Sequence, residues 1–314
     1  MLDQKLLQQF SVVAARAAYS SSLLKGKNDK IAADQAAVDS MRNYLNKIDM
    51  NGQIVIGEGE MDEAPMLFIG EKLGTGEGEN LDIAVDPLDG TTLTAKNLPD
   101  AISVIAVSEN GNLLKAPDTY MEKIAIGPGY PENIIDLDNT IETNLKNIAE
   151  FKSVKTSDLT VCLLERERHE PIVKVLNKLS AKTKFISDGD VLGAIYTCVD
   201  RFNVDMYVGI GGAPEGVLAA AAIKCFGGQF QGRLIISNND EKLRATKLGI
   251  SDMKKKYYLN DLVKGDVIFC AAGVTDGEML KGIRIDGNNF LADLLVLHSE
   301  AKISKIYTET LEIW

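Results

Sequence analysis

The stretch Leu81-Asp82-Ile83-Ala84-Val85-Asp86-Pro87-Leu88-Asp89-Gly90-Thr91 joins a short apolar run to an acidic, glycine-containing segment. Residues 81–85 are typical of a β-strand. Pro87 fixes its own φ and biases the residue before it toward an extended backbone. We therefore expect Asp86 to leave the strand with its carboxylate pointing into a cleft, because ligands of α/β sheets collect where strands end.

The second half of this segment carries further polar groups. Asp89 follows three residues after Asp86, and we expect a tight turn between them. Gly90 permits a close approach of the backbone to a ligand. Thr91 supplies a hydroxyl and an N–H at an expected helix start, where an anion is favoured. Two carboxylates, a turn and a hydroxyl suit a two-metal phosphatase, but the same hexapeptide is also typical of an Asp-Pro turn followed by a helix cap.

The rest of the chain alternates β-rich runs with amphipathic stretches. An N-terminal helix is expected from the spacing of Leu6, Phe10, Val13 and Ala17. We expect further strands at 53–56, 102–107, 123–126, 160–164, 184–186 and 205–210, and helices at 31–48, 65–72, 171–179, 191–198 and 214–225. Strands alternating with helices predict α/β layers. A polar stretch at 130–156 places a boundary between an N-terminal metal-binding lobe, 1–155, and a C-terminal α/β substrate lobe, 156–314.

Acidic or glycine-rich loops follow several of these expected strands. In addition to Asp86, they hold Glu58, Asp188, Asp190 and Glu215. A pocket of bare carboxylates repels itself, and divalent cations are the usual remedy. Oxygen ligands without His or Cys favour Mg²⁺ or Mn²⁺ over Zn²⁺. Taken singly, the Glu58 segment is as compatible with a solvated acidic turn, and residues 187–190 with a turn and a helix cap. Residues 209–216 resemble a phosphate-cradling loop but lack the Lys-Ser/Thr of a P-loop.

Composition narrows the classes of function. The 314 residues carry a net charge of -11, which disfavours nucleic acid as a partner, whereas bound metal ions can still admit a small anion. Two histidines supply zinc or Ser-His-Asp chemistry poorly. Four widely spaced cysteines predict reduced thiols in the cytoplasm. We expect neither a signal peptide nor a membrane span, since no apolar stretch is long enough.

Five motifs occur in order along the chain: Ile54-Val-Ile-Gly-Glu-Gly-Glu60, Asp62-Glu-Ala-Pro-Met66, Asp82-Ile-Ala-Val-Asp-Pro-Leu-Asp-Gly-Thr91, Asp188-Gly-Asp190 and Gly209-Ile-Gly-Gly-Ala-Pro-Glu-Gly216. In this order they resemble the class II fructose-1,6-bisphosphatases, the bacterial enzymes of the glycerol-regulon type. The resemblance extends from residues 26–30 to residues 273–277. The Asp-Pro-x-Asp-Gly-Thr element alone is shared with the wider lithium-sensitive phosphatase superfamily, which includes the inositol monophosphatases.

The resemblance implies a fold and an activity. The fold is a layered α-β-α-β-α sandwich of the sugar phosphatase type, with two lobes in one compact unit. The activity is hydrolysis of fructose 1,6-bisphosphate to fructose 6-phosphate and phosphate by a metal-activated water, in gluconeogenesis, with Mn²⁺ or Mg²⁺. A cytoplasmic homodimer or homotetramer is expected. The alternatives are a phosphatase for sedoheptulose 1,7-bisphosphate or an inositol phosphate, and a non-catalytic phosphosugar sensor.

The resemblance also assigns the site residues. Asp34 and Glu58 match the ligands of one metal ion, and Asp86, Asp89 and Glu215 match those of a second. Lys30, Asp62 and Thr91 match positions associated with catalysis. The matches to substrate-binding positions are Asp89, Gly90, Thr91, Thr92, Tyr120, Arg166, Glu167, Arg168, Asp188, Gly189, Asp190 and Gly212. Asp89 stands where some members carry Glu, which is one methylene longer, and this difference can change the geometry around the second ion.

Overall fold

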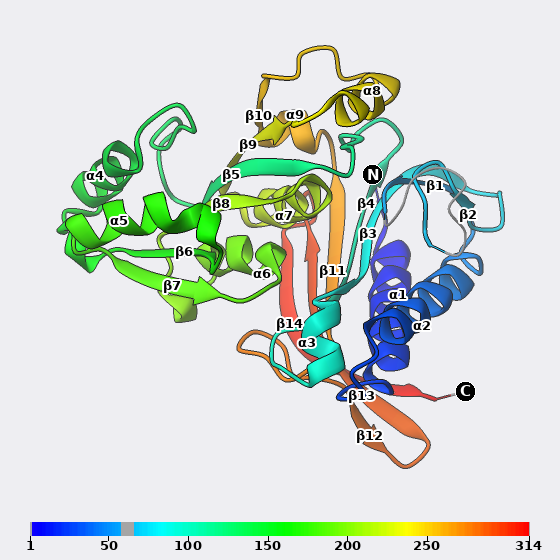
Figure 1. Ribbon diagram of the computed structural model, residues 1–314. Helices are drawn as coiled ribbons and strands as arrows, with labels where there is room; N and C mark the ends of the chain where they lie inside the picture. Colours follow the sequence, from blue (N-terminus) through cyan, green and yellow to red (C-terminus); the bar gives the residue numbers. More distant parts are fainter. Residues whose placement is uncertain (1, 58–65, 314) are drawn as a thin grey trace. The chain divides into compact units, whose positions relative to one another are not determined.

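The computed structural model describes residues 2–57 and 66–313. The chain forms two compact units, one of residues 1–114 and 265–314 and the other of residues 115–264. Each unit contains one β-sheet with helices packed on it (Figure 1). The α/β class expected from the sequence is therefore confirmed. The lobe boundary predicted at residue 155 falls inside the second unit, and the division of metal binding and substrate binding between the lobes stays a prediction.

The first unit is built on an eight-stranded sheet. Its order is β2-β1-β3-β4-β11-β13, and β13 also pairs with β12 and β14. The strands are β1 (Met50–Ile56), β2 (Lys72–Leu73), β3 (Glu79–Asp89), β4 (Ile102–Glu109), β11 (Val267–Gly273), β12 (Arg284–Asp286), β13 (Asn289–His298) and β14 (Ile303–Glu312). Only β1 and β3 are parallel to each other; every other pair is antiparallel within the described residues.

Two long helices cover one face of this sheet. They are α1 (Gln4–Ser22) and α2 (Lys30–Leu45), which lie side by side (Figure 1). Each begins at an aspartate whose carboxylate accepts a backbone N–H, Asp3 for α1 and Asp29 for α2. The apolar stripe of α1, with Phe10 fully buried, packs on β3, β4, β11 and β13. The amphipathic N-terminal helix is thus confirmed.

The segment around Asp86 differs from the expected turn. Strand β3 continues through Pro87 to Asp89, and its pairing with β4 shifts between Asp86 and Asp89. Pro87 has no N–H to donate to the ladder, so the extra residue forms a β-bulge here. The expected helix does follow, as α3 (Thr91–Lys96), and Gly90 before it has a φ of 101°. The bulge re-aims the acidic side chains without ending the strand.

The helix predicted at 65–72 is wrong over its described part. Residues 66–71 form loop and turn, and Lys72–Leu73 is strand β2. The segment is held by tertiary hydrogen bonds, because Arg42 of α2 donates to the carbonyl of Met66 and to the carboxylate of Glu71. These contacts outweigh the local helix propensity.

The second unit is a six-stranded sheet in the order β10-β9-β5-β8-β6-β7. Its strands are β5 (Tyr120–Ile126), β6 (Thr160–Leu164), β7 (Lys182–Ile186), β8 (Met206–Gly212), β9 (Gln229–Ile235) and β10 (Lys256–Tyr258). Its helices are α4 (Ile141–Lys152), α5 (Glu170–Lys178), α6 (Asp190–Ile195), α7 (Ala213–Phe226), α8 (Asn239–Lys247) and α9 (Leu259–Leu262), with short 3₁₀ turns η1 (Thr156–Asp158), η2 (Glu167–His169), η3 (Tyr196–Cys198) and η4 (Asp200–Phe202).

Helices cover both faces of this second sheet. α4 and α5 bury Leu145, Ile148 and Leu176 in one core cluster with Val208 of β8. Tyr207 precedes Val208 in β8, and it points to the opposite face of the sheet because side chains alternate along a strand. Gly193 of α6 lies close to the ring of Tyr207, so α6 covers this opposite face. The second unit is therefore a three-layer α-β-α structure.

All four cysteines are thiols, with Cys162, Cys225 and Cys270 buried. Among the described residues, no helix combines the length and the apolar character that crossing a bilayer requires.

Candidate functional site

The second unit gathers predicted substrate-binding segments along one edge of its sheet. Strand β6 is parallel to both β7 and β8, so the carboxyl ends of three strands meet there. Strand β5 runs antiparallel to β8 with Tyr120 opposite Gly212, so its first residue lies at the same edge. We call this set, Tyr120 with residues 165–169, 187–190 and 211–215, the carboxyl edge.

Arg166 links two loops of the carboxyl edge. Its Nη1 donates to the carbonyl of Ser187 over 2.6 Å, and its Nη2 lies 3.3 Å from Oδ1 of Asp188. The loop after β6 is thereby tied to the loop after β7. Both predicted substrate residues, Arg166 and Asp188, are half-buried, so they retain access to solvent.

Arg168 is oriented by the end of β8. Its Nε and Nη2 donate to the carbonyl of Ile210 over 3.0 and 2.7 Å, and its guanidinium lies 5.0 Å from the ring centroid of Tyr120. A cation over an aromatic face is attracted by the ring quadrupole. Glu167, between the two arginines, is exposed in η2. The two arginines are held in place and are available to an anionic ligand.

His169 organises this arrangement, and the sequence analysis did not single it out. Its Nδ1 lies 2.7 Å from the carbonyl of Leu164, and the backbone N–H of Ile210 donates to its Nε2 over 2.8 Å. The ring is therefore neutral with its proton on Nδ1. Burial lowers the pKa of His169, and the positive charge of Arg168 adds to this effect. A Cβ at Gly209 would lie 3.0 Å from the ring, so a glycine suits this position.

A second residue that the sequence analysis missed is Lys123. Its side chain is 1% exposed and its Nζ lies 2.5 Å from Oδ2 of Asp190. The hydroxyl of Tyr207 donates to the same oxygen over 3.2 Å. A Cβ at Gly211 would lie 1.9 Å from that oxygen, so the glycine makes room for the pair. The signal was a single lysine inside the apolar strand of residues 120–126.

Glu215 occupies the first turn of α7, which begins after Gly212. Its Oε2 is buried and has no hydrogen-bond partner among the described residues. Burial raises the pKa of its carboxyl; the charge of Lys123 opposes this shift and that of Asp190 adds to it. A Cβ at Gly212 would lie 1.9 Å from Oε2, so glycine is required beside it. A desolvated, unpartnered carboxylate oxygen is a suitable ligand for a cation.

The first unit holds the other predicted metal ligands. Asp86 and Asp89 flank the bulge of β3, and Asp34 lies on α2, which packs against β3. Oδ1 of Asp34 and Oδ2 of Asp89 are buried. Oδ1 of Asp86 accepts the N–H of Leu88 over 3.1 Å.

The remaining candidates of the first unit lie near α3. The loop before α2 pairs with α3, since Gly26 and Asn28 donate to carbonyls within it. Lys30, the first residue of α2, is exposed, and Thr91 and Thr92 are half-buried at the start of α3. The structure thus places the predicted catalytic lysine and threonine on two connected segments.

Two predicted residues, Glu58 and Asp62, lie outside the described residues. Within 2–57 and 66–313, no three His, Cys, Asp or Glu side chains form a group that could hold a metal ion. The acidic residues that are described supply only carboxylate oxygens, and this donor chemistry fits Mg²⁺ or Mn²⁺.

Comparison with known proteins gives a consistent result. A model of the family described as bacterial fructose-1,6-bisphosphatase, glpX-encoded, matches residues 4–310. The chain is 44% identical to the class 2 fructose-1,6-bisphosphatase of Haemophilus influenzae, over 96% of this chain and 94% of that protein. It is 41% identical to the fructose-1,6-bisphosphatase 1 class 2 of Escherichia coli K12, over 96% and 93%.

Similar solved structures have low identity. They include the extragenic suppressor protein suhB of Bartonella henselae, with a TM-score of 0.35, 12% identity and coverage of 62% of this chain and 74% of that one. An IMPase of Thermotoga maritima has a TM-score of 0.34, 13% identity and coverage of 64% and 80%.

Replacing His169 should change the pH dependence of stability. Because the folded chain lowers the pKa of His169, the unfolded chain takes up this proton first, and the free energy of unfolding falls as pH drops below about 6.5. This contribution is at most about 1.4 kcal/mol per pH unit. Urea unfolding of wild type and His169→Gln between pH 5 and 8 measures it. Equal slopes for the two proteins would contradict the buried neutral state.

Replacing Lys123 should destabilise the second unit strongly. Lys123→Met leaves the buried carboxylate of Asp190 without its cation, and removing one partner of a buried pair costs about 3–5 kcal/mol. The matched control is Lys146→Met, which removes an exposed i,i+4 pair with Glu142 and should cost below about 0.5 kcal/mol. Urea midpoints of both variants measure the difference. Similar midpoints would show that the buried pair is not stabilising.

Proposed function

The chain belongs to the glpX-encoded family of bacterial fructose-1,6-bisphosphatases and hydrolyses fructose 1,6-bisphosphate to fructose 6-phosphate and phosphate, and we propose that its acidic side chains hold the divalent metal ions of this reaction. The observation that carries the activity is the match of the family over residues 4–310. The observation that supports a cation is the buried, unpartnered Oε2 of Glu215.

The metal ligands divide into two sets. Asp34 and Glu58 would hold one ion, and Asp86, Asp89 and Glu215 the second; the support for these sets is the family resemblance and not a preformed group of carboxylates among the described residues. The cofactor is Mn²⁺ or Mg²⁺, because every donor is a hard oxygen. When bound, such ions lower the pKa of a water and neutralise charge on phosphoryl oxygens. Asp89 is shorter than glutamate, and its bulge position on β3 determines how far its carboxylate reaches.

Other residues of this chain position the substrate. Arg166 and Arg168 bind a phosphate group, for which their planar guanidinium groups are suited. Asp188 accepts hydrogen bonds from sugar hydroxyls. Oδ2 of Asp190 already accepts from Lys123 and Tyr207, so this residue also fixes the loop that carries Asp188.

The remaining substrate contacts are those of Asp89, Gly90, Thr91, Thr92, Tyr120, Glu167, Gly189 and Gly212. The catalytic roles go to Lys30, Asp62 and Thr91. Lys30 neutralises phosphate charge, and the hydroxyl of Thr91 orients the attacking water. The exposure of Lys30 leaves its ammonium free to approach a phosphate.

The alternatives are less well supported. Sedoheptulose 1,7-bisphosphate and inositol phosphates are not favoured by the family, nor is a non-catalytic phosphosugar sensor. The protein acts as a cytoplasmic homo-oligomer, a dimer or a tetramer, with no nucleic-acid partner. The reduced thiols and the net charge of -11 support the location and the absence of nucleic acid.

Removing the carboxylate charge of Asp86 should abolish most turnover. Asp86→Asn weakens one metal ligand, and we expect a loss of a thousandfold or more in kcat, roughly 4 kcal/mol of transition-state stabilisation. Phosphate release from fructose 1,6-bisphosphate measures it. Asp286→Asn, the same change on exposed β12, is the control and should retain wild-type turnover. Near-wild-type turnover of Asp86→Asn would remove this residue from the mechanism.

Metal removal should stop the reaction and change thermal stability. Protein treated with EDTA should release no phosphate, and Mn²⁺ or Mg²⁺ should restore release from fructose 1,6-bisphosphate in preference to sedoheptulose 1,7-bisphosphate or inositol 1-phosphate. Mn²⁺ should also raise the Tm of wild type more than that of Glu215→Gln, because a ligand that binds the folded state stabilises it. Faster release from inositol 1-phosphate would overturn the substrate, and equal Tm shifts would overturn Glu215 as a ligand.

A further inference from the structure

Strand β14 forms a long edge of the first unit's sheet. It pairs antiparallel with β13 over all ten of its residues, from Ile303 opposite His298 to Glu312 opposite Asn289. Among the described residues, no strand pairs with its other side. We call this side the β14 edge. Unpaired strand edges present backbone donors and acceptors that are suited to pairing with another strand.

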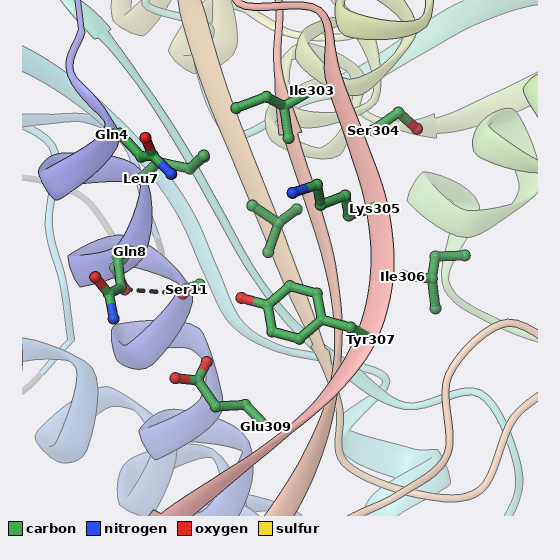
Figure 2. Close-up of a pocket in the computed structure, with 11 residues that line it drawn as sticks. Gln4, Leu7, Gln8, Ser11, Ile303, Ser304, Lys305, Ile306, Tyr307 and Glu309 are labelled. Carbon is green, nitrogen blue, oxygen red and sulfur yellow. Dashed lines mark hydrogen bonds between the residues drawn. The ribbon is translucent and has the colours of Figure 1, made fainter.

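The β14 edge carries side chains that suit a protein partner. The large side chains of Ile306 and Tyr307 are 41% and 38% exposed, although most of the surface of each side chain is apolar. Lys305, Tyr307 and Glu309 alternate along the strand on the face toward α1 (Figure 2). They line a pocket of about 830 Å³ together with residues of α1, which include Ser11.

Glu309 makes no ion pair among the described residues, although Lys305 lines the same pocket. Its Oε2 is buried and has no hydrogen-bond partner among the described residues. Burial raises the pKa of its carboxyl, and the neighbouring Tyr307 hydroxyl opposes that shift only in part. A carboxylate oxygen removed from water is costly unless it is paired.

Lys305 is the nearest cation along the strand, and it makes no ion pair within the described part of the chain. The two residues lie four positions apart on one strand, which separates them by about 13 Å. This distance excludes a pair within one strand. A cation opposite Glu309, and an anion opposite Lys305, would have to come from outside this strand.

We propose that the β14 edge binds the β14 edge of a second copy of this chain, antiparallel and centred on Tyr307. In this register Lys305 lies opposite Glu309 of the partner subunit, and the same pair recurs by symmetry. A two-fold contact uses the same patch on both subunits, so a self-complementary strand is what it requires. Opposite charges directly across two antiparallel strands stabilise the pair.

The register follows from the sequence of the strand. Residues directly opposite each other on two antiparallel strands point to the same face of the sheet, and side chains alternate along each strand. Two identical strands can therefore pair only if the two-fold axis passes through a residue and not between two residues. Centred on Tyr307, it also places Ile303 opposite Leu311 of the partner subunit. Centred on residue 306, Ile303 would face a glutamate; centred on residue 308, Lys305 would face a leucine. Only the first register pairs both charges and both apolar residues.

This contact would also cover the pocket between α1 and β14. Tyr307 and Glu309 line this pocket (Figure 2), and in the proposed register side chains of the partner strand would lie beside them. The proposal specifies the contact of the homo-oligomer proposed above and does not involve the catalytic residues. Its failure is therefore visible in the oligomeric state, whereas failure of the catalytic proposal is visible in phosphate release.

The test is a charge exchange read out by mass in solution. Lys305→Glu places two carboxylates opposite each other, and Glu309→Lys places two ammonium groups opposite each other. Each variant should lose this contact and show half the wild-type mass by light scattering after size exclusion. An equimolar mixture should regain the wild-type mass, because the carboxylate introduced in one variant would then face the ammonium introduced in the other. A monomeric wild type, unchanged masses of both single variants, or a mixture that stays at half mass would each overturn the proposal.

A crosslink checks the register independently and does not require a charge change. Tyr307→Cys should form a disulfide with its copy, since directly opposed Cα atoms on antiparallel strands lie about 4.5–5.5 Å apart, within the range of about 4.4–6.8 Å that a disulfide spans. Mild oxidation should give a covalent dimer that is absent from wild type and from the neighbouring control Thr308→Cys. Equal crosslinking of Tyr307→Cys and the control, or none in either, would contradict the register.

Discussion

The buried ion pair between Lys123 and Asp190 is the interaction on which the carboxyl edge depends. It joins β5 in the middle of the second sheet to the loop after β7, which also carries Asp188. Tyr207 adds a hydrogen bond from β8, so side chains of two strands, β5 and β8, converge on one carboxylate oxygen of the residue that begins α6. A buried carboxylate is stable only when its charge is compensated, and this requirement fixes the loop whose outer residues are exposed to a ligand.

The arginines depend on a second buried group in the same way. His169 connects the end of β6 to the end of β8 through a carbonyl and an N–H, and Ile210 then offers its carbonyl to Arg168. A long, exposed cation loses much conformational freedom when it binds a phosphate. The buried imidazole of His169 positions Ile210, whose carbonyl orients Arg168 before a ligand binds, so less conformational freedom is lost on binding. In this way His169 can contribute to binding without contacting the ligand.

Sequence reasoning succeeded where chemistry and pattern coincide. Most strands were found where Pro87 fixes the local backbone and where glycines such as Gly90 permit the conformations that follow a strand. It failed where tertiary contacts decide: Arg42 holds residues 66–71 as a loop, and a bulge replaces the expected turn after Asp86. Lys123 and His169 were missed because a lysine in a strand and a histidine in a charged run are typical of surfaces, and only their burial shows what they bind.

Two glutamates of this chain share one unusual property, a buried carboxylate oxygen without a partner among the described residues, and their surroundings call for different cations. Glu215 lies in a helix's first turn beside Asp190, where its nearest lysine is already paired with that aspartate. A second lysine there would have to displace the pair, so a small ion of higher charge density fits better. Glu309 lies on an edge strand, and Lys305 lies on the same face of that strand. A two-fold axis through Tyr307 would place Lys305 of a second subunit opposite Glu309. The same electrostatic deficit thus indicates a metal ion in one place and a second subunit in the other.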